Sequence, residues 1–340
     1  MEDEMRLRIS RSAAISAAFV AAVARIFVDL SLDGDALHNG IWIAALLGAV
    51  PAIPYLLCLD ALPENTTPFR KALMLILLLI TAVDTAQVLS IVTRASGYLT
   101  LEFVSPLWLT IPVALVAIWC TWRNGDAVGY AAMLWTKVFP ALMLVVIMLQ
   151  LRHYHAQWLH PVLGNGWPDI ARGGIRASGC FVPVTAVMLA CDDAVRENKH
   201  RPTIGWVAAA PVLAALLLLL RLMMAPTGIY ALPWLSRLDA LLTNGRAPLY
   251  LQLPMITAFF VSLFHILTCE CFAASALLQR LIPALNGHLC GAIIVISSVF
   301  ISLSGFVGTQ YVTLAFPIAA IAVALAVLFQ PKRKGAVAHA

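Results

Sequence analysis

Charged residues are scarce in this sequence. Of its 340 residues, 11% are charged and 61% are hydrophobic, and the mean hydropathy is +0.90. Soluble domains carry about 25% charged residues, so this composition excludes a soluble globular domain and predicts a polytopic membrane protein in contact with the lipid bilayer. The net charge of +5 does not indicate a nucleic-acid partner, because cytoplasmic loops of membrane proteins are rich in Lys and Arg.

The sequence also lacks the motifs of several enzyme classes. It contains no GxxxxGK[ST], HExxH or GxSxG pattern, which would cradle phosphates, bind zinc or present a nucleophilic serine. The cysteines fall mostly inside apolar runs and are interpreted as small buried residues rather than a disulfide framework. Cys269 and Cys271 are two positions apart, so a helix points them in different directions. We predict no enzyme activity, no cofactor and no metal site.

Long apolar runs make up most of the chain. A membrane-spanning helix needs about 20 apolar residues, and ten runs qualify, at 12–30, 40–60, 70–92, 104–122, 127–150, 170–192, 203–223, 251–279, 288–306 and 309–329. The prediction is an all-α polytopic membrane protein with a single transmembrane permease domain over residues 1–330 and a basic cytoplasmic tail over 331–340. Ten spans divide into two sets of five, and an odd number per half gives the halves opposite orientations, as in an inverted repeat. The first repeat is expected at about 12–150 and the second at about 170–329.

Basic residues predict the orientation. With the N-terminus inside, the cytoplasmic segments hold more Lys and Arg than the outer segments, which favours both termini in the cytoplasm. The N-terminal segment is charged and the first apolar run is long enough to remain as a span, so no cleavable signal peptide is expected. The longest outer loop runs over residues 225–250.

The stretch 160–201 is the most informative for function. A glycine-rich polar segment leads into an apolar run that contains Gly179 and Pro183, so this run is not expected to form one straight helix. Interrupted helices at membrane depth line binding cavities, because their freed backbone groups need partners. We predict that Gly179, Phe181 and Pro183 lie at the ligand site. A kinked helix with a packing role only is the alternative.

Charges inside the other spans are the remaining candidates, since each costs about 2.5–3.5 kcal/mol on insertion scales. Arg25 and Asp29 lie one helical turn apart in the first span and are predicted to pair, either at the substrate or through snorkelling to the interface. Asp84 lies in a polar part of the third span, which lines an aqueous cavity or forms an interhelical hydrogen-bond cluster. Arg25 and Asp84 are predicted to bind substrate.

Three residues are candidates for substrate binding or ion coupling. Lys137 lies within the fifth span, where a buried lysine exchanges a proton, replaces a sodium ion, or forms a tethering salt bridge to Glu270 or Asp192. His265 and Glu270 lie on the eighth span and are candidates for a proton path, with His265 also predicted at the substrate. The alternative for Glu270 is a partly solvated residue near the cytoplasmic end.

The order of several motifs resembles one known family. The second span begins HNGIWIAALLGAVPAIPYLL, the fifth begins RNGDAVGYAAMLWTKVFPALML, and the sixth is preceded by HPVLGNGWPDIARGG and followed by the basic loop RENKHR. In this order the motifs resemble the GerAB-type spore germination permeases, the B subunits of germinant receptors, in the amino acid–polyamine–organocation superfamily. The sequence departs from the superfamily in its first span, which contains neither Gly nor Pro, whereas that span is usually unwound around glycines.

The resemblance implies a fold and a function. It implies a LeuT-like fold with ligand bound near the bilayer midplane between the first, third, sixth and eighth helices. It further implies a spore inner-membrane protein that binds a small nutrient, with an amino acid as the expected class, alongside A-type and C-type receptor subunits. In proton-coupled relatives a lysine on the fifth helix takes the place of a sodium ion, and Lys137 resembles that residue in helix number. A proton-coupled amino-acid transporter that acts without receptor partners is the alternative.

Overall fold

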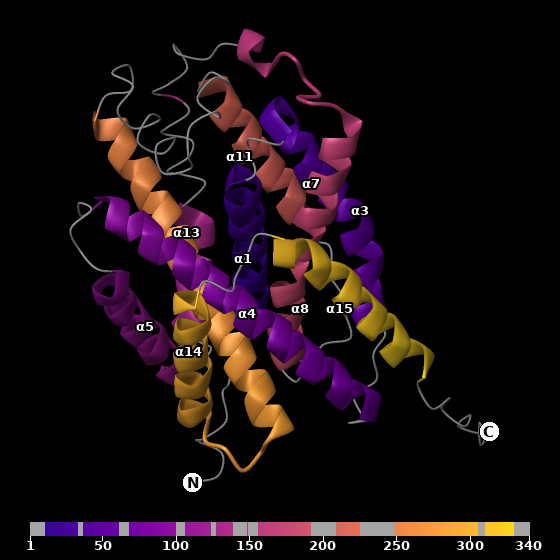
Figure 1. The fold of residues 1–340 in the computed structure, drawn as a ribbon, viewed down its shortest axis with the longest axis vertical. Helices are drawn as coiled ribbons and strands as arrows, with labels where there is room; N and C mark the ends of the chain where they lie inside the picture. The colour runs from indigo at the N-terminus through magenta and orange to yellow at the C-terminus, as the bar shows by residue number, and fades with distance from the viewer. Residues whose placement is uncertain are drawn as a thin grey trace.

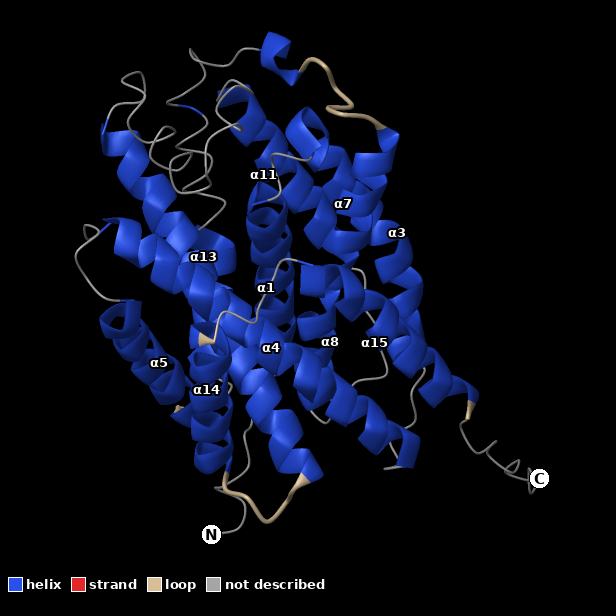
Figure 2. Cartoon of the chain, viewed as in Figure 1, coloured by secondary structure: helices blue, strands red, loops and turns tan. Residues whose placement is uncertain are grey.

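The structure is a computed structural model of the chain, and it describes residues 11–32, 37–60, 68–99, 106–123, 127–138, 148, 156–191, 209–224, 249–304 and 310–329. The predicted basic loop 196–201, the outer-loop residues 225–248 and the tail 331–340 lie outside the described residues. Within the described part the chain is helical and contains no strand (Figure 2).

Helices occupy every one of the ten predicted spans. A helical segment at 127–138 lies in the fifth predicted span. The labelled elements are α1 (Arg11–Leu32), η2 (His38–Gly40), α3 (Ile41–Asp60), α4 (Pro68–Leu99), α5 (Pro106–Trp122), η4 (Ala156–Leu159), α7 (Trp167–Gly179), α8 (Phe181–Ala190), α11 (Ala210–Met224), α13 (Leu249–Leu281), α14 (Gly287–Leu303) and α15 (Gln310–Leu328).

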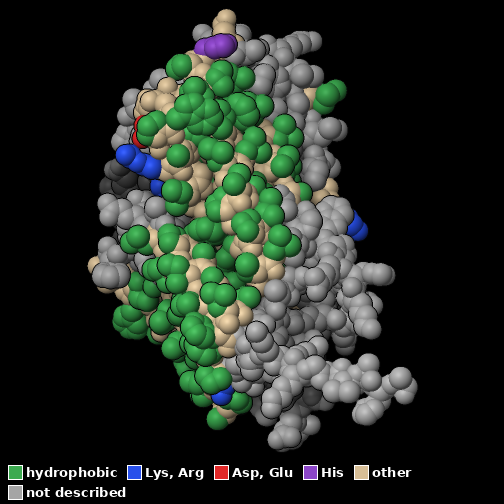
Figure 3. Space-filling view, turned by 90° about the vertical axis from the view of Figure 1, so that its right-hand side faces the viewer, with side chains coloured by type: hydrophobic (Ala, Val, Ile, Leu, Met, Phe, Trp, Pro, Cys, Tyr) green, Lys and Arg blue, Asp and Glu red, His purple; other side chains and the backbone are tan. Residues whose placement is uncertain are grey.

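Five of the described helical stretches are long and apolar enough to cross a membrane, and four shorter apolar helices accompany them. Hydrophobic side chains cover most of the described part of the face drawn in Figure 3, with few charged side chains among them. Such a surface suits lipid rather than water, because little of it would need hydration. The prediction of a polytopic membrane protein is confirmed.

The sixth span is broken, as Gly179 and Pro183 predict. Helix α7 ends at Gly179, α8 begins at Phe181, and the amide of Cys180 between them donates to the carbonyl oxygen of Ala177 at 3.2 Å. Pro183 has no N–H to donate to Gly179 four residues earlier, and its ring would collide with that carbonyl in a regular helix. The position of the proline therefore accounts for the position of the break.

The first span, by contrast, is one continuous helix. Helix α1 runs unbroken from Arg11 to Leu32, in agreement with its lack of Gly and Pro. It contacts α3, α7, α8, α11 and α13 and lies among these helices in the middle of the molecule (Figure 1). Small alanines along α1 are almost wholly buried, including Ala13, Ala17 and Ala22, and they permit this close packing on several sides.

The packing partners repeat after five spans. Helix α3 packs on α11, α4 on α13, and α5 on α14, and α1 packs on α7 and α8. Each of these pairs joins a span to its counterpart five spans later, when α7 and α8 are counted as one. The contacts between different spans correspond in the same way. The first span contacts the eighth (α1 with α13), and the third contacts the sixth (α4 with α8). An approximate two-fold relation between two sets of five helices explains this pattern, as the span count predicts.

Glycines bring α7 and α3 together beside the break. An added Cβ at Gly48 of α3 would lie 2.5 Å from the Cβ of Ala177, and one at Gly174 of α7 would lie 2.9 Å from the Cβ of Leu47. Real Cβ atoms do not approach this closely, so both positions require glycine or a shift of the backbone. The two helices thus hold the N-terminal side of the break against α3.

Candidate functional site

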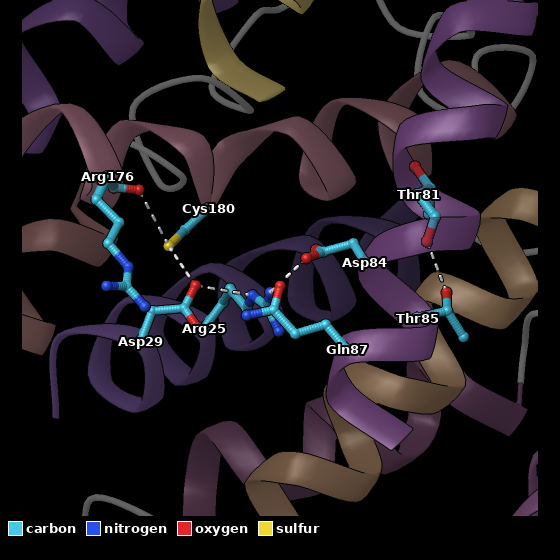
Figure 4. Close-up of polar contacts among 8 residues, drawn as sticks. All are labelled: Arg25, Asp29, Thr81, Asp84, Thr85, Gln87, Arg176 and Cys180. Atoms are coloured by element: carbon cyan, nitrogen blue, oxygen red, sulfur yellow. Dashed lines mark hydrogen bonds and ion pairs between the residues drawn. The ribbon is translucent and has the colours of Figure 1, made fainter. Parts of the chain in front are cut away.

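A group of buried polar side chains lies where α1, α4, α13 and the α7–α8 break meet. Its members come from three helices and the break, and we call it the Arg25 cluster: Arg25, Asp29, Asp84, Gln87, Cys180 and Glu270. Figure 4 shows the part formed by α1, α4 and the break. The Arg25, Asp29 and Glu270 residues are at most 1% exposed. These are the helices between which the family resemblance implies a ligand.

Arg25 is the central residue of the cluster. Its Nε atom lies 3.0 Å from Oδ2 of Asp29, one turn later on α1. Its Nη2 atom donates to Oδ1 of Asp84 and, at 3.3 Å, to Oε1 of Gln87, both on α4 (Figure 4). The predicted pairing of Arg25 with Asp29 is confirmed, and snorkelling to the interface is wrong for both because both are buried. Asp84 and Gln87 therefore belong to an interhelical hydrogen-bond cluster, which was one of the two alternatives predicted for Asp84.

Glu270 joins the cluster from α13. Its carboxyl group lies within hydrogen-bonding reach of the carboxyl group of Asp84. The interpretation of Glu270 as a partly solvated residue is wrong, since the residue is 1% exposed. Packing against α4 and α1 keeps this part of α13 away from solvent.

Besides Nε of Arg25, which forms the ion pair with Asp29, three buried polar atoms of the cluster have no hydrogen-bond partner among the described residues. They are the Nη1 donor of Arg25 and two carboxylate oxygens, Oδ1 of Asp29 and Oε2 of Glu270. Buried polar atoms in folded proteins are almost always paired. An unpaired donor and two unpaired acceptors from neighbouring side chains therefore indicate a place for a ligand.

The break and the last turn of α7 each contribute one residue that the sequence analysis did not select. The Sγ atom of Cys180 donates to Oδ2 of Asp29 at 3.3 Å, and Arg176, which is 5% exposed, points toward Asp29 in the view of Figure 4. Arg176 lies inside the predicted span 170–192, so the rule that intramembrane charges are functional candidates would have selected it. Cys180 gave no comparable signal.

The other predicted residues at the break are buried beside the cluster. Gly179, Phe181 and Pro183 are all buried, and Phe181 and Pro183 belong to the first turn of α8. One turn beyond Phe181, the Oγ1 atom of Thr185 lies 2.9 Å from the Tyr55 hydroxyl of α3. The structure therefore places these residues next to Cys180, and their contact with a ligand stays a prediction.

His265 is apart from the Arg25 cluster. Its Nε2 atom lies 3.3 Å from the carbonyl oxygen of Ala17, and Sγ of Cys269 donates to the same oxygen at 3.7 Å. Ala17 is eight residues before Arg25, which is about 12 Å along a helix. His265 and Cys269 thus join α13 to α1 two turns away. Cys271 packs in a different hydrophobic group from Cys269, as their spacing predicts.

Lys137 is exposed, so the expectation of a buried lysine is wrong. It lies next to the last residue of the described segment 127–138, whereas Glu270 is buried and faces Asp84. The alternative partner Asp192 lies outside the described residues. The coupling role of Lys137 stays a prediction.

A small cavity lies on the opposite side of α1 from Arg25. Its volume is about 50 Å³, and its lining is mostly apolar, with Phe19, Val23, Phe27, Trp135 and Leu217 among its residues. None of the predicted site residues lines this cavity. Across the described ranges, no group of three or more His, Cys, Asp and Glu residues is placed to hold a metal ion.

The arrangement of the helices has a match among solved structures. The chain is similar to Mhp1, a nucleobase-cation-symport-1 family transporter solved in a closed conformation with bromovinylhydantoin bound. The TM-score is 0.64 and the identity is 14%, and the match covers 94% of this chain and 79% of the transporter chain. The protein has the LeuT-type transporter fold. The predicted all-α, LeuT-like fold is confirmed, and the division into two inverted sets of five helices stays a prediction.

Comparison of the sequence with known families and proteins does not assign the chain to a family. No protein-family model matches the chain, and no curated protein sequence matches it. At 14% identity, the structural match shows the fold of this chain.

Proposed function

We propose that this protein is a permease that binds a small zwitterionic nutrient of the amino-acid class at the Arg25 cluster and carries it across the membrane with a proton. The observation that carries the proposal is the set of unpaired buried atoms on Arg25, Asp29 and Glu270. One is a cationic donor and two are carboxylate acceptors. An amino acid presents the complementary pair, a carboxylate and an ammonium group, on one small molecule.

The chemistry of recognition follows from those atoms. Nη1 of Arg25 would donate to the ligand carboxylate, in a charge-assisted hydrogen bond of the strong class. Oδ1 of Asp29 and Oε2 of Glu270 would accept from its ammonium group. All three residues are closed to solvent in this structure, so binding requires movement of the surrounding helices. The α7–α8 break is the place where one half of a span moves relative to the other.

Uptake into proteoliposomes tests this proposal. The purified full-length chain would be reconstituted with an imposed pH gradient, alkaline inside, and supplied with labelled amino acids. We expect accumulation that a protonophore abolishes. Unlabelled amino acids should compete, whereas matched amines that lack the carboxylate and matched acids that lack the ammonium group should not. Absence of uptake for the whole panel would contradict the transport proposal.

A germinant-receptor subunit is the second candidate, and the order of the sequence motifs favours it. In this role the chain would lie in the spore inner membrane with both termini cytoplasmic, bind the same kind of nutrient, and pass a conformational signal to A-type and C-type subunits. The ligand would shift an existing equilibrium through its different affinity for two states. Spores that lack the gene would then lose germination with one nutrient and regain it with the restored gene. A normal response to every nutrient would leave the transporter as the remaining candidate.

A further inference from the structure

The Arg25 cluster contains more acids than bases. Three carboxyl groups, on Asp29, Asp84 and Glu270, lie with the guanidinium of Arg25. The guanidinium of Arg176, also buried, points toward Asp29 (Figure 4). If every group were ionised, one negative charge would remain uncompensated in a closed, low-dielectric interior. Such a charge costs several kcal/mol, so another positive charge is needed.

The acids also touch each other in a way that requires a proton. The buried carboxyl groups of Asp84 on α4 and Glu270 on α13 lie within hydrogen-bonding reach of each other, where these two helices pack together. Two ionised carboxylates are both acceptors and repel each other, so the bond forms only when one of them carries a proton. The number of protons that this bond needs is one, which is also the number that neutralises the cluster.

The charged, polar and titratable groups beside this carboxyl pair come from α1, α4, α13 and the α7–α8 break. Helix α1 supplies Arg25 and Asp29, and α4 supplies the neutral Gln87. The break supplies Cys180, while Cys269 and Cys271 flank Glu270 on α13. Arg25 is the positive group among them that contacts Asp84. Arg25 also binds Asp29 and attracts Glu270, so its single positive charge is divided among three acids.

We propose that Asp84 and Glu270 bind one shared proton, which joins α4 to α13 in the closed state and is the proton that moves with the ligand. This inference rests on the proposed transport function and names the residues that couple it. A zwitterion brings no net charge, so the closed cluster holds ligand and proton together. Loss of the proton leaves two carboxylates in contact and drives α4 and α13 apart. The coupling ratio expected is one proton for each nutrient molecule.

Infrared spectroscopy of the full-length protein in liposomes tests the proton directly, without ligand and without transport. We expect a carboxylic-acid C=O band at neutral pH that shifts in D₂O. Glu270→Gln and Asp84→Asn should each remove it, because the remaining acid is then an ordinary carboxylate beside Arg25. The matched control is Asp169→Asn on α7, whose side chain is 29% exposed and pairs with Arg172, and which should leave the band unchanged.

A second measurement guards against simple misfolding. Glu270→Gln keeps the shape of the side chain and a donor toward Asp84, so the variant should melt within a few degrees of the native protein. The melting temperature of the native protein should fall as the pH rises and removes the shared proton, and that of Glu270→Gln should not. In proteoliposomes this variant should lose accumulation driven by the pH gradient.

The outcomes separate this inference from the proposed function. The band without any uptake would support the proton site and contradict the transport function. Uptake with no band in the native protein, or with a band that survives both substitutions, would overturn the proton site. The native protein could instead show no band and be stabilised by sodium chloride but not by choline chloride. A metal cation would then neutralise the cluster, and this result would also overturn the inference.

Discussion

The guanidinium of Arg25 on α1 binds the carboxylate of Asp84 on α4, although 59 positions separate them in the sequence. Both helices belong to the first set of five spans, and the acid that contacts Asp84, Glu270, belongs to the second. The polar contacts therefore connect the two repeats at the point where α1, α4 and α13 meet. Any motion that separates the repeats must rearrange these groups.

Removal of the central cation is expected to be costly. Arg25→Leu would leave Asp29 and Asp84 as buried acids without their shared partner, and loss of one member of a buried ion pair typically costs about 3–5 kcal/mol. Arg25→Lys should recover only part of the loss, because an ammonium group does not reproduce the planar, multiple donation of a guanidinium. Thermal unfolding of the purified protein in detergent would measure both variants.

The control for Arg25 is an exposed arginine on α7. Arg172 pairs with Asp169 at 3.3 Å, and its side chain is 80% exposed. Exposed pairs contribute about 0–1 kcal/mol, so Arg172→Leu should leave the melting temperature nearly unchanged. Equal effects of Arg25→Leu and Arg172→Leu would contradict the structure of the cluster.

Close packing of α3 on α7 gives a second prediction. Gly48→Ala would place a Cβ 2.5 Å from the Cβ of Ala177 and 3.1 Å from the amide of Ser178. Overpacking of this kind costs about 1–3 kcal/mol, which exceeds the gain of about 1 kcal/mol that alanine has over glycine within a helix. We expect a lower melting temperature. The double substitution Gly48→Ala with Ala177→Gly should restore part of it, and a more stable Gly48→Ala variant would show that the helices are further apart.

A single hydroxyl group links α3 to α8. Thr185 donates to the carbonyl oxygen of Val182 at 2.7 Å, so in its 2.9 Å contact with Tyr55 the tyrosine is the donor. Tyr55→Phe removes that bond and keeps the edge-on contact of the ring with Phe316. The expected loss is about 0.5–1.5 kcal/mol. The control is Tyr130→Phe, at a residue that is 61% exposed. An equally small change in the free energy of unfolding for both variants would show that the Tyr55 hydroxyl does not bind Thr185.

The sequence predicted the helices better than their contacts. Each of the ten apolar runs contains a helix among the described residues, because a bilayer imposes its thickness on every span. The break in the sixth span followed from Gly179 and Pro183, and the continuity of α1 followed from the absence of such residues. These features depend on local chemistry, which a single stretch of sequence contains.

The composition of the site required the fold. Arg25 and Asp29 are neighbours on one helix and were predicted to pair, but nothing local shows that Asp84 and Glu270 meet. The prediction of burial failed for Lys137 because the sequence shows that a residue lies within an apolar run and does not show which side of the helix packs on other helices. Arg176 and Cys180 were not selected because their role depends on Asp29 of α1.

Gly179 tests whether the break touches the ligand. It is buried next to Cys180, and a large side chain there would fill space beside the cluster. We expect Gly179→Leu to weaken nutrient binding, measured as a smaller ligand-induced rise of the melting temperature. Ile175→Leu on the same helix, at a residue that is 47% exposed, should bind normally. Unchanged affinity in Gly179→Leu would exclude Gly179 from the site.

Lys137 is the subject of the last prediction, because it was expected to act as a buried residue and the structure places it at the surface. Its side chain is exposed in this structure, so a coupling role requires that it reach the Arg25 cluster in another state of the transport cycle. We expect Lys137→Met to impair gradient-driven uptake more than it lowers the melting temperature. Arg123→Met removes another exposed cation, one that stacks on Trp119, and should not impair uptake. Normal uptake by Lys137→Met at normal membrane abundance would exclude the lysine from coupling, and the carboxyl pair of Asp84 and Glu270 would then remain as the proposed proton carrier.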